Sequence, residues 1–269
     1  KILIEADAFP SDIYAVNSQI SHHGYEPKDT LLKLSSRAGE SVVITEDIEQ
    51  VIREKGDEIA LIMLGGVNYY TGQVFDLETI TKLAHKKGIL VGFDLAHAAG
   101  NIKLELNKWN VDFAVWCSYK YLNSGPGSLA GAFIHEKHHK SNLPRFAGWW
   151  GHNKENRFKM PDDFEPIESA EGWQQSNPPI LSLAAIRASL SLFDEVGMSV
   201  LIEKSKKLSD YLLFLLNEIK TEKINIITPK EKGCQVSIQV KNADKKLFEI
   251  ITKKGVVADW REPDVIRIA

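Results

Sequence analysis

Cysteine is scarce in this sequence. Its two cysteines among 269 residues, Cys117 and Cys234, lie far apart and do not have the spacing of metal ligands. This scarcity argues against a disulfide framework and favours a reducing compartment, so we expect a cytoplasmic protein. The adjacent histidine pairs, His22-His23 and His138-His139, have no third ligand nearby in the sequence, and we expect no metal site.

Long apolar runs and an excess of charge of one sign are missing too. No apolar run approaches the ~20 residues that span a bilayer. The formal net charge is −3, which gives no bulk attraction to nucleic acid or to an anionic membrane. With 43% hydrophobic and 26% charged residues, the chain has the composition of an ordinary globular protein with a large core. We therefore expect neither nucleic acid nor a membrane as a partner.

Strands and helices alternate along the first part of the chain. Apolar runs bounded by turn residues predict strands at residues 1–4, 60–64, 89–94, 113–116 and 130–135. Amphipathic segments predict helices at residues 11–20, 45–55 and 77–87. This alternation is typical of an α/β fold with a mostly parallel sheet, in which ligands bind at the carboxyl ends of the strands.

A smaller C-terminal domain is expected after an irregular segment at 136–176, an apolar helix at 180–196 and a long helix at 200–220. The sequence beyond them predicts strands at 235–240, 256–259 and 265–269 and a helix at 243–254. We expect a large domain over residues 1–200 and a small α+β domain over residues 201–269. Strands that begin at residue 1 without a lead-in and stop at residue 269 suggest a sequence truncated at both ends, with part of the large domain missing.

Two polar residues end buried strands of the predicted sheet. Asp94 ends the run 89–94, and Lys120 follows the run 113–116. A lysine at a strand end usually extends to solvent, but a buried lysine held neutral is a nucleophile towards aldehydes. An acid, a histidine three residues on (His97) and a lysine about two dozen residues later together resemble the layout of pyridoxal 5'-phosphate (PLP) enzymes of the aspartate-aminotransferase fold.

Longer motifs make the resemblance more specific. They are Phe9-Pro-Ser-Asp12, Tyr70-Thr-Gly-Gln73, Asp94-Leu-Ala-His97, Cys117-Ser-Tyr-Lys-Tyr-Leu-Asn-Ser-Gly-Pro-Gly127, Gly148-Trp-Trp-Gly-His152 and Gln175-Ser-Asn-Pro-Pro179. Over essentially its whole length the chain resembles the kynureninase family, whose members have the fold type I, class V aminotransferase-like architecture. The resemblance implies PLP as cofactor. It also implies hydrolysis of L-kynurenine, or its 3-hydroxy form, to anthranilate or 3-hydroxyanthranilate and L-alanine in tryptophan catabolism and NAD biosynthesis.

The resemblance also implies roles for residues of the large domain. Lys120 would bind the cofactor covalently and then remove the substrate's α-proton, and Asp94 would keep a proton on the pyridine nitrogen. Tyr119 would reach the cofactor phosphate and serve as an acid later in the reaction. The other residues implied to contact the cofactor in this part of the chain are Phe9, Ser11, Asp12 and His97.

Further roles fall later in the chain. The resemblance implies a homodimer with sites shared across its interface, and Trp149 and Asn177 match residues that reach the site from the neighbouring subunit. Ser176 and Asn177 would contact the substrate. Arg267 matches the arginine that grips the substrate's α-carboxylate, for which a bidentate fork is suited.

The chain departs from the family pattern in two places. Gly65 stands where many relatives have a serine near the phosphate, and an upstream segment with a threonine-bearing phosphate-binding turn is absent. The alternatives are another enzyme of the same fold, such as a cysteine desulfurase or a class V aminotransferase, and a non-catalytic fragment of the fold. A desulfurase needs an exposed reactive cysteine on a mobile loop, and neither Cys117 nor Cys234 fits that description.

Overall fold

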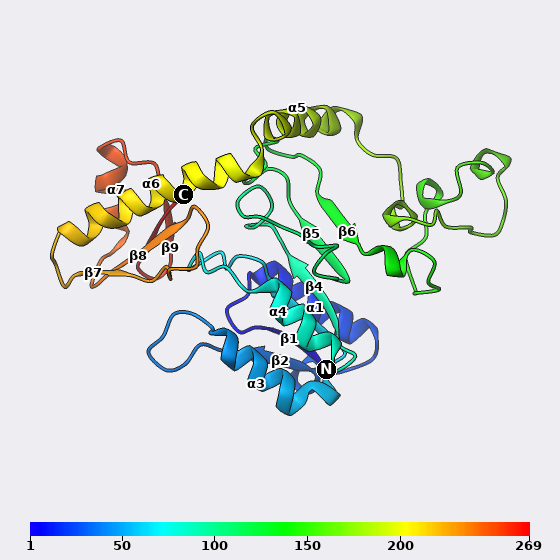
Figure 1. Ribbon diagram of the computed structural model, residues 1–269, viewed down its shortest axis with the longest axis horizontal. Helices are drawn as coiled ribbons and strands as arrows, with labels where there is room; N and C mark the ends of the chain where they lie inside the picture. Colours follow the sequence, from blue (N-terminus) through cyan, green and yellow to red (C-terminus); the bar gives the residue numbers. More distant parts are fainter.

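A computed structural model describes residues 1–269, which form two sheets (Figure 1). The larger sheet has the strand order β2-β1-β3-β4-β5-β6. Its strands are β1 (Ile2–Glu5), β2 (Leu31–Leu34), β3 (Leu61–Gly65), β4 (Leu90–Asp94), β5 (Phe113–Trp116) and β6 (Gly131–Ile134). All neighbours pair in parallel except β6, which is antiparallel to β5. The predicted α/β fold with a mostly parallel sheet is confirmed.

Helices cover both faces of this sheet. They are α1 (Pro10–His22), α2 (Pro27–Thr30), α3 (Thr45–Lys55) and α4 (Leu77–His85). Leu3 belongs to the main core, which also holds buried side chains of α3 and α4, whereas Ile4 packs with buried residues of α1. Because successive side chains of a strand point to opposite faces, these two neighbours in β1 contact different helices. The helices predicted at 11–20, 45–55 and 77–87 are confirmed.

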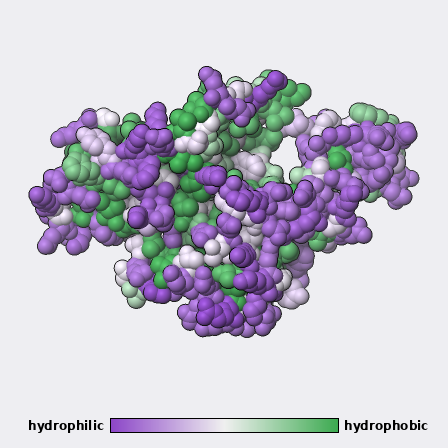
Figure 2. Space-filling view, viewed as in Figure 1, coloured by the Kyte–Doolittle hydropathy of each residue, from purple (hydrophilic) through white to green (hydrophobic).

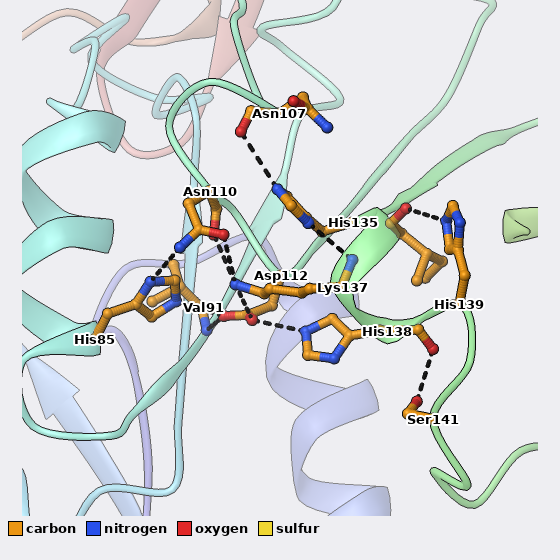
Figure 3. A network of polar contacts seen from close by, with 11 residues as sticks. His85, Val91, Asn107, Asn110, Asp112, His135, Lys137, His138, His139 and Ser141 are labelled. Atoms are coloured by element: carbon orange, nitrogen blue, oxygen red, sulfur yellow. Dashed lines mark hydrogen bonds and ion pairs between the residues drawn. The ribbon is translucent and has the colours of Figure 1, made fainter.

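The buried carboxylate of Asp112 links β4 to β5 at the amino-terminal ends of these two strands. Asp112 accepts hydrogen bonds from Val91 N at 2.7 Å and from His85 Nε2 and His138 Nε2, each at 2.8 Å. Lys137 Nζ lies 2.8 Å from the same carboxylate, and Figure 3 shows these side chains converging on it. Burial alone would raise the pKa of Asp112, but these donors together hold it at about 2.

The smaller sheet follows two long helices, α5 (Ile180–Val196) and α6 (Met198–Glu218). It contains β7 (Ile224–Ile226), β8 (Val236–Val240), β9 (Asp259–Arg261) and β10 (Val265–Ile268), with helix α7 (Lys245–Lys253) between β8 and β9. All pairs in its order β7-β8-β10-β9 are antiparallel. In Figure 1 it lies to the left of the larger sheet, below α6.

Two expectations for this sheet were wrong. The three-residue strand β7 has too short a pattern for sequence analysis, which assigned no strand there. The strand expected at 256–259 begins at Asp259, because Val256 N instead donates to Ile251 O and closes the end of α7. Val257 is exposed and unpaired with any strand.

Residues 136–176 form an arm that carries four short 3-10 turns. They are η2 (Glu136–His138), η3 (Trp149–Gly151), η4 (Arg157–Lys159) and η5 (Ala170–Trp173). The expectation of mostly irregular structure is confirmed. Beyond its first turn, most of the arm extends away from β6, on the right of Figure 1. It is tied together internally, since His152 Nδ1 accepts from Glu165 N at 3.0 Å and Arg145 stacks 3.9 Å from the centre of the Trp173 ring.

Helix α5 is apolar but largely uncovered. Ile180 and Leu181 are 80% and 88% exposed, and Figure 2 shows apolar surface at the top of the view, where α5 lies.

Strand β5, at 113–116, is buried on one side only, with Ala114 inaccessible and Val115 41% exposed. None of the helices has the length and apolar character needed to cross a membrane.

Candidate active site

A cleft opens at the carboxyl ends of β1, β3 and β4. These strands end at Glu5, Gly65 and Asp94, so their parallel pairing brings the three residues to one edge of the sheet. The rest of the lining comes from the loops beyond these strands and from the first turn of α1: Ala8, Phe9, Asp12, Val67, Asn68, Tyr69, His97 and Lys120. Five of the site residues predicted from sequence therefore meet in one place, although they lie up to 111 positions apart.

Asp12 and Asp94 form an acid pair in this cleft. Burial, then the charge of Asp94 and a hydrogen bond between the two carboxyl groups, raise the pKa of Asp12 to about 7. Asp94 Oδ1 also accepts a hydrogen bond from Ala96 N at 2.7 Å. The pair therefore holds a proton near neutral pH that it can share with a bound basic group.

Lys120 lines the cleft together with two aromatic side chains, Phe9 and Tyr69. Its Nζ is 5.7 Å from the centre of the Phe9 ring, and the edge of that ring meets Tyr69 at 5.3 Å between centroids. Phe9 precedes Pro10, the first residue of α1, so the start of this helix places Phe9 and Asp12 in the cleft together. The lysine thus faces an aromatic surface on one side and the acid pair on the other, and its charge partly offsets the rise in the pKa of Asp12.

His97 is neutral and lacks a partner. Burial, followed by the charges of Lys120, Arg267 and Arg261, lowers the pKa of His97 to about 3. Its Nδ1 atom is buried and makes no hydrogen bond, and its ring edge meets Tyr121 at 5.8 Å. An orphaned ring nitrogen in a polar cleft is a position where a bound group can satisfy it.

Glu5 is a site residue that sequence analysis missed. It is buried, and burial raises its pKa, although its carboxylate accepts from Asn68 Nδ2 at 2.7 Å and from Gly65 N at 2.8 Å. A Cβ at Gly65 would lie 3.1 Å from Glu5 Oε1, a tight contact. The signal was present: Glu5 ends a buried strand as an acid, as Asp94 does.

Hydrogen bonds to three consecutive backbone carbonyls, those of Tyr69, Tyr70 and Thr71, connect the cleft to the smaller sheet and are called the joint below. Tyr69 O accepts from Arg267 Nη1 at 2.8 Å, and Tyr70 O accepts from Ser237 Oγ at 2.5 Å. Thr71 O accepts from Thr228 Oγ1 at 2.6 Å, and the fully buried amide of Gln235 donates to both Tyr69 O and Tyr70 O. The joint fixes β10, and with it Arg267, against the loop that lines the cleft.

The remaining predicted residues lie outside the cleft of this chain. Ser11 is exposed on the first turn of α1, and Tyr119 is 53% exposed beside Cys117, which raises the pKa of the phenol. Trp149 lies on the arm, where its Nε1 donates to Arg157 O at 3.2 Å. Ser176 and Asn177 are exposed where the arm leads into α5.

The chain matches the Aminotransferase class-V family over residues 32–258. It is similar to the kynureninases of Flavobacterium psychrophilum, Koribacter versatilis and Nematostella vectensis, at 57%, 53% and 49% identity. These matches cover 100% of this chain and 65%, 64% and 61% of the relatives. The chain thus spans slightly less than two thirds of the length of the curated relatives it matches.

Solved structures share the fold at much lower identity. A C-DES mutant with glycine covalently linked to its PLP cofactor superposes with a TM-score of 0.80 at 18% identity. The cysteine desulfurase CsdA from Escherichia coli gives 0.81 at 13% identity. Both comparisons cover 100% of this chain, and 69% and 66% of those chains. They confirm the predicted fold type I architecture.

Proposed function

Because the chain belongs to the aminotransferase class-V family, we propose that it acts as a kynureninase. The reaction is hydrolysis of L-kynurenine, or its 3-hydroxy form, to anthranilate or 3-hydroxyanthranilate and L-alanine. The observation that carries the proposal is the meeting of Lys120, Asp94, Asp12 and His97 in one cleft of a chain 57% identical over 276 residues to a kynureninase. Enzymes that catalyse other reactions share this fold, so the fold alone does not identify the reaction. The sequence identity to kynureninases favours kynurenine hydrolysis over those other reactions.

The cleft fits PLP as cofactor. Lys120 is the amine that can bind its aldehyde, Phe9 offers an aromatic face for its ring, and the acid pair Asp12–Asp94 can hold a proton on its ring nitrogen. The buried, unpartnered Nδ1 of His97 marks polar lining that a bound group can complete. Ser11 and Tyr119 are each adjacent in sequence to a cleft residue and are proposed to reach its phosphate.

Each of these groups has a task in the reaction. Bound PLP supplies an electron sink for the charge that develops at the substrate's α-carbon. Lys120 takes and returns the proton at that carbon as a general base and acid. His97 stays neutral and packs in the cleft without adding a second positive charge near the lysine. Arg267, on the smaller sheet, binds the α-carboxylate.

Water must then add to the γ-carbonyl of the substrate, and an acid must supply a proton as the Cβ–Cγ bond breaks. Tyr119 can serve as this acid, since a phenol is protonated at neutral pH and Tyr119 is adjacent to Lys120 in the sequence. We further propose a cytoplasmic homodimer in which Trp149 and Asn177 complete the site of the neighbouring subunit, while Ser176 contacts the substrate. Trp149 on the arm and Asn177 just after it are both exposed and do not line the cleft of their own chain, which supports this assignment.

Cysteine chemistry is disfavoured by the surroundings of both thiols. Burial raises the pKa of Cys234, and its thiol contacts the hydroxyl of the buried Tyr121. Cys117 Sγ lies 3.9 Å from Ala96 O, directly after β5. A desulfurase needs a thiolate on an accessible loop, and neither position provides one.

The proposal is tested with the full-length protein loaded with PLP. L-Kynurenine, 3-hydroxy-L-kynurenine, L-cysteine and a transamination pair are each supplied, and the aromatic product, alanine, sulfide and keto acids are quantified. The account expects equal amounts of aromatic amine and alanine from one or both kynurenines. Sulfide from cysteine, or keto acid without the aromatic amine, would reassign the reaction to one of the rival activities.

A further inference from the structure

A second arginine and a carboxylate share one face of the β9–β10 hairpin with Arg267. Asp259 and Arg267 stand directly opposite each other in the antiparallel register, and Arg261 lies two residues beyond Asp259 in β9. Because side chains two apart in a strand share a face, all three project to the same side of the hairpin. Neither Asp259 nor Arg261 has a role in the reaction described above.

Asp259 accepts a hydrogen bond from one terminal nitrogen, Nη2, of the Arg267 guanidinium group. Arg267 Nη2 donates to Asp259 Oδ2 at 2.5 Å, while Nη1 donates to Tyr69 O. The same Oδ2 atom accepts from Arg261 Nε at 2.9 Å and lies 2.8 Å from Arg261 Nη2. One carboxylate oxygen therefore bridges two guanidinium groups. A substrate carboxylate that binds Arg267 through Nη2 must compete with Asp259 for that nitrogen.

These residues border the cleft and differ in exposure. Arg261 Cζ lies 5.9 Å from the centre of the Tyr69 ring, which lines the cleft. The Arg267 side chain is 14% exposed, whereas those of Asp259 and Arg261 are 43% and 34% exposed. Asp259 can therefore turn outward with Arg261, while Arg267 stays pinned by the carbonyl of Tyr69.

We propose that, before substrate binds, the Asp259 carboxylate occupies the position on Arg267 that the substrate carboxylate later takes. When substrate binds, Asp259 leaves Arg267 and stays bound to Arg261. This inference rests on the proposed role of Arg267 as the carboxylate-binding residue. In the empty site Asp259 neutralises a mostly buried guanidinium, whose isolated charge would be costly. In the filled site the substrate carboxylate takes Arg267 Nη2, and Asp259 keeps its two contacts with Arg261. Both are positioning residues, since neither touches the reacting atoms.

The exchange predicts opposite effects for the two side chains. In the full-length PLP-loaded protein, Asp259→Asn lowers KM for L-kynurenine about tenfold, because a charge-assisted competitor for Arg267 has been removed. Arg261→Gln raises KM about tenfold, because Asp259 then has Arg267 as its sole cation. In both variants kcat stays within about twofold of the unchanged protein, since the chemistry is untouched. Arg261→Lys restores part of the affinity through a single-point charge.

Two controls separate the exchange from a structural role. Asp264→Asn removes one negative charge beside the same hairpin, but that carboxylate accepts from Gln239 rather than from an arginine, so KM stays unchanged. Calorimetric binding of L-alanine is compared with binding of the amine that kynurenine becomes when its carboxylate is removed. Asp259→Asn tightens binding of alanine and leaves that amine unaffected.

The outcomes also separate this inference from the proposed reaction. If alanine binds more tightly to Asp259→Asn but kynurenine is never cleaved, the reaction is wrong and the carboxylate exchange stands. If kynurenine is cleaved and neither Asp259→Asn nor Arg261→Gln changes KM or alanine affinity, the exchange is wrong and the reaction stands. Should Asp259→Asn fail to fold, Arg261→Gln decides alone, because an unchanged or lowered KM in that variant contradicts the exchange.

Discussion

At the scale of single residues, the site depends on ionisable groups whose pKa values the cleft moves apart. His97 is held neutral, while Asp12 keeps its proton to about pH 7. Perturbed pKa values of this kind gather at functional sites because burial and neighbouring charges act there together. The sequence could predict Asp94, His97 and Lys120, since each follows a recognisable strand. Glu5 also ends a buried strand, but its partners Gly65 and Asn68 become its neighbours only through the pairing of β1 with β3, so the sequence could not predict these contacts.

Asp12 makes the stability of the cofactor-free protein depend on pH. Its folded-state pKa of about 7 exceeds its ordinary value of 3.8, so its favourable contribution is complete below about pH 4 and is lost as pH rises through 7. Asp12→Asn removes this loss. After discounting for the partial exposure of the group, the variant should be more stable than the unchanged protein at pH 8 by about 1–2 kcal/mol.

Urea unfolding of the cofactor-free protein at pH 5 and pH 8 measures this difference. Asp29→Asn, on the exposed face of α2, is the matched control and should follow the unchanged protein at both values. If Asp12→Asn loses as much stability between pH 5 and pH 8 as the unchanged protein does, the shared proton of the acid pair is disproved.

At the scale of elements, Asp112 sets how β4 and β5 meet, and these are the strands that lead to Asp94 and Lys120. Asp112→Asn removes the charge that its histidine and lysine partners surround, and breaking a buried ion pair of this kind costs about 3–5 kcal/mol of unfolding free energy. His138→Ala removes one donor and costs about 1 kcal/mol.

The same carboxylate gives the protein its acid sensitivity. The folded-state pKa of about 2 lies below the ordinary 3.8, so the stabilisation is present above about pH 4 and is lost as pH falls towards 2. Unfolding of both variants at pH 7 and pH 3 measures the effect. Equal stability of Asp112→Asn and the unchanged protein at pH 7 would contradict the role given to this network.

The sequence predicted the bounds of some helices and strands but not the contacts between the two sheets. The helix expected at 180–196 matches α5 to the residue, because Pro178-Pro179 precede it and Gly197, with a φ of 81°, follows it. The joint between the sheets could not be predicted, since its hydrogen bonds run from backbone carbonyls near Tyr70 to side chains 157–198 positions away. Neither composition nor periodicity records such contacts.

At the scale of the whole molecule, the arm carries predicted site residues away from the cleft of its own chain. If Trp149 and Asn177 complete a neighbouring subunit's site, a mixture of Lys120→Ala and Asn177→Ala proteins forms hybrid dimers with one intact site. Random exchange between equal amounts restores about a quarter of the full activity, since half the dimers are hybrids and each has one working site.

Activity of the mixture before and after subunit exchange measures this recovery, and differently tagged subunits verify that exchange has taken place. Each variant alone is the control and stays inactive or nearly so. No recovery in a mixture with verified hybrids would mean that the arm serves the cleft of its own chain.

The central claim is that Lys120, at the end of the large sheet, is the residue that holds the cofactor. The most direct test is to load the full-length protein with PLP, reduce it with borohydride and map the pyridoxyl group by peptide mass spectrometry. We expect one labelled lysine per chain, Lys120, and no label at that site in Lys120→Ala. A label on another lysine, or a protein that takes up no label while remaining folded, would contradict it.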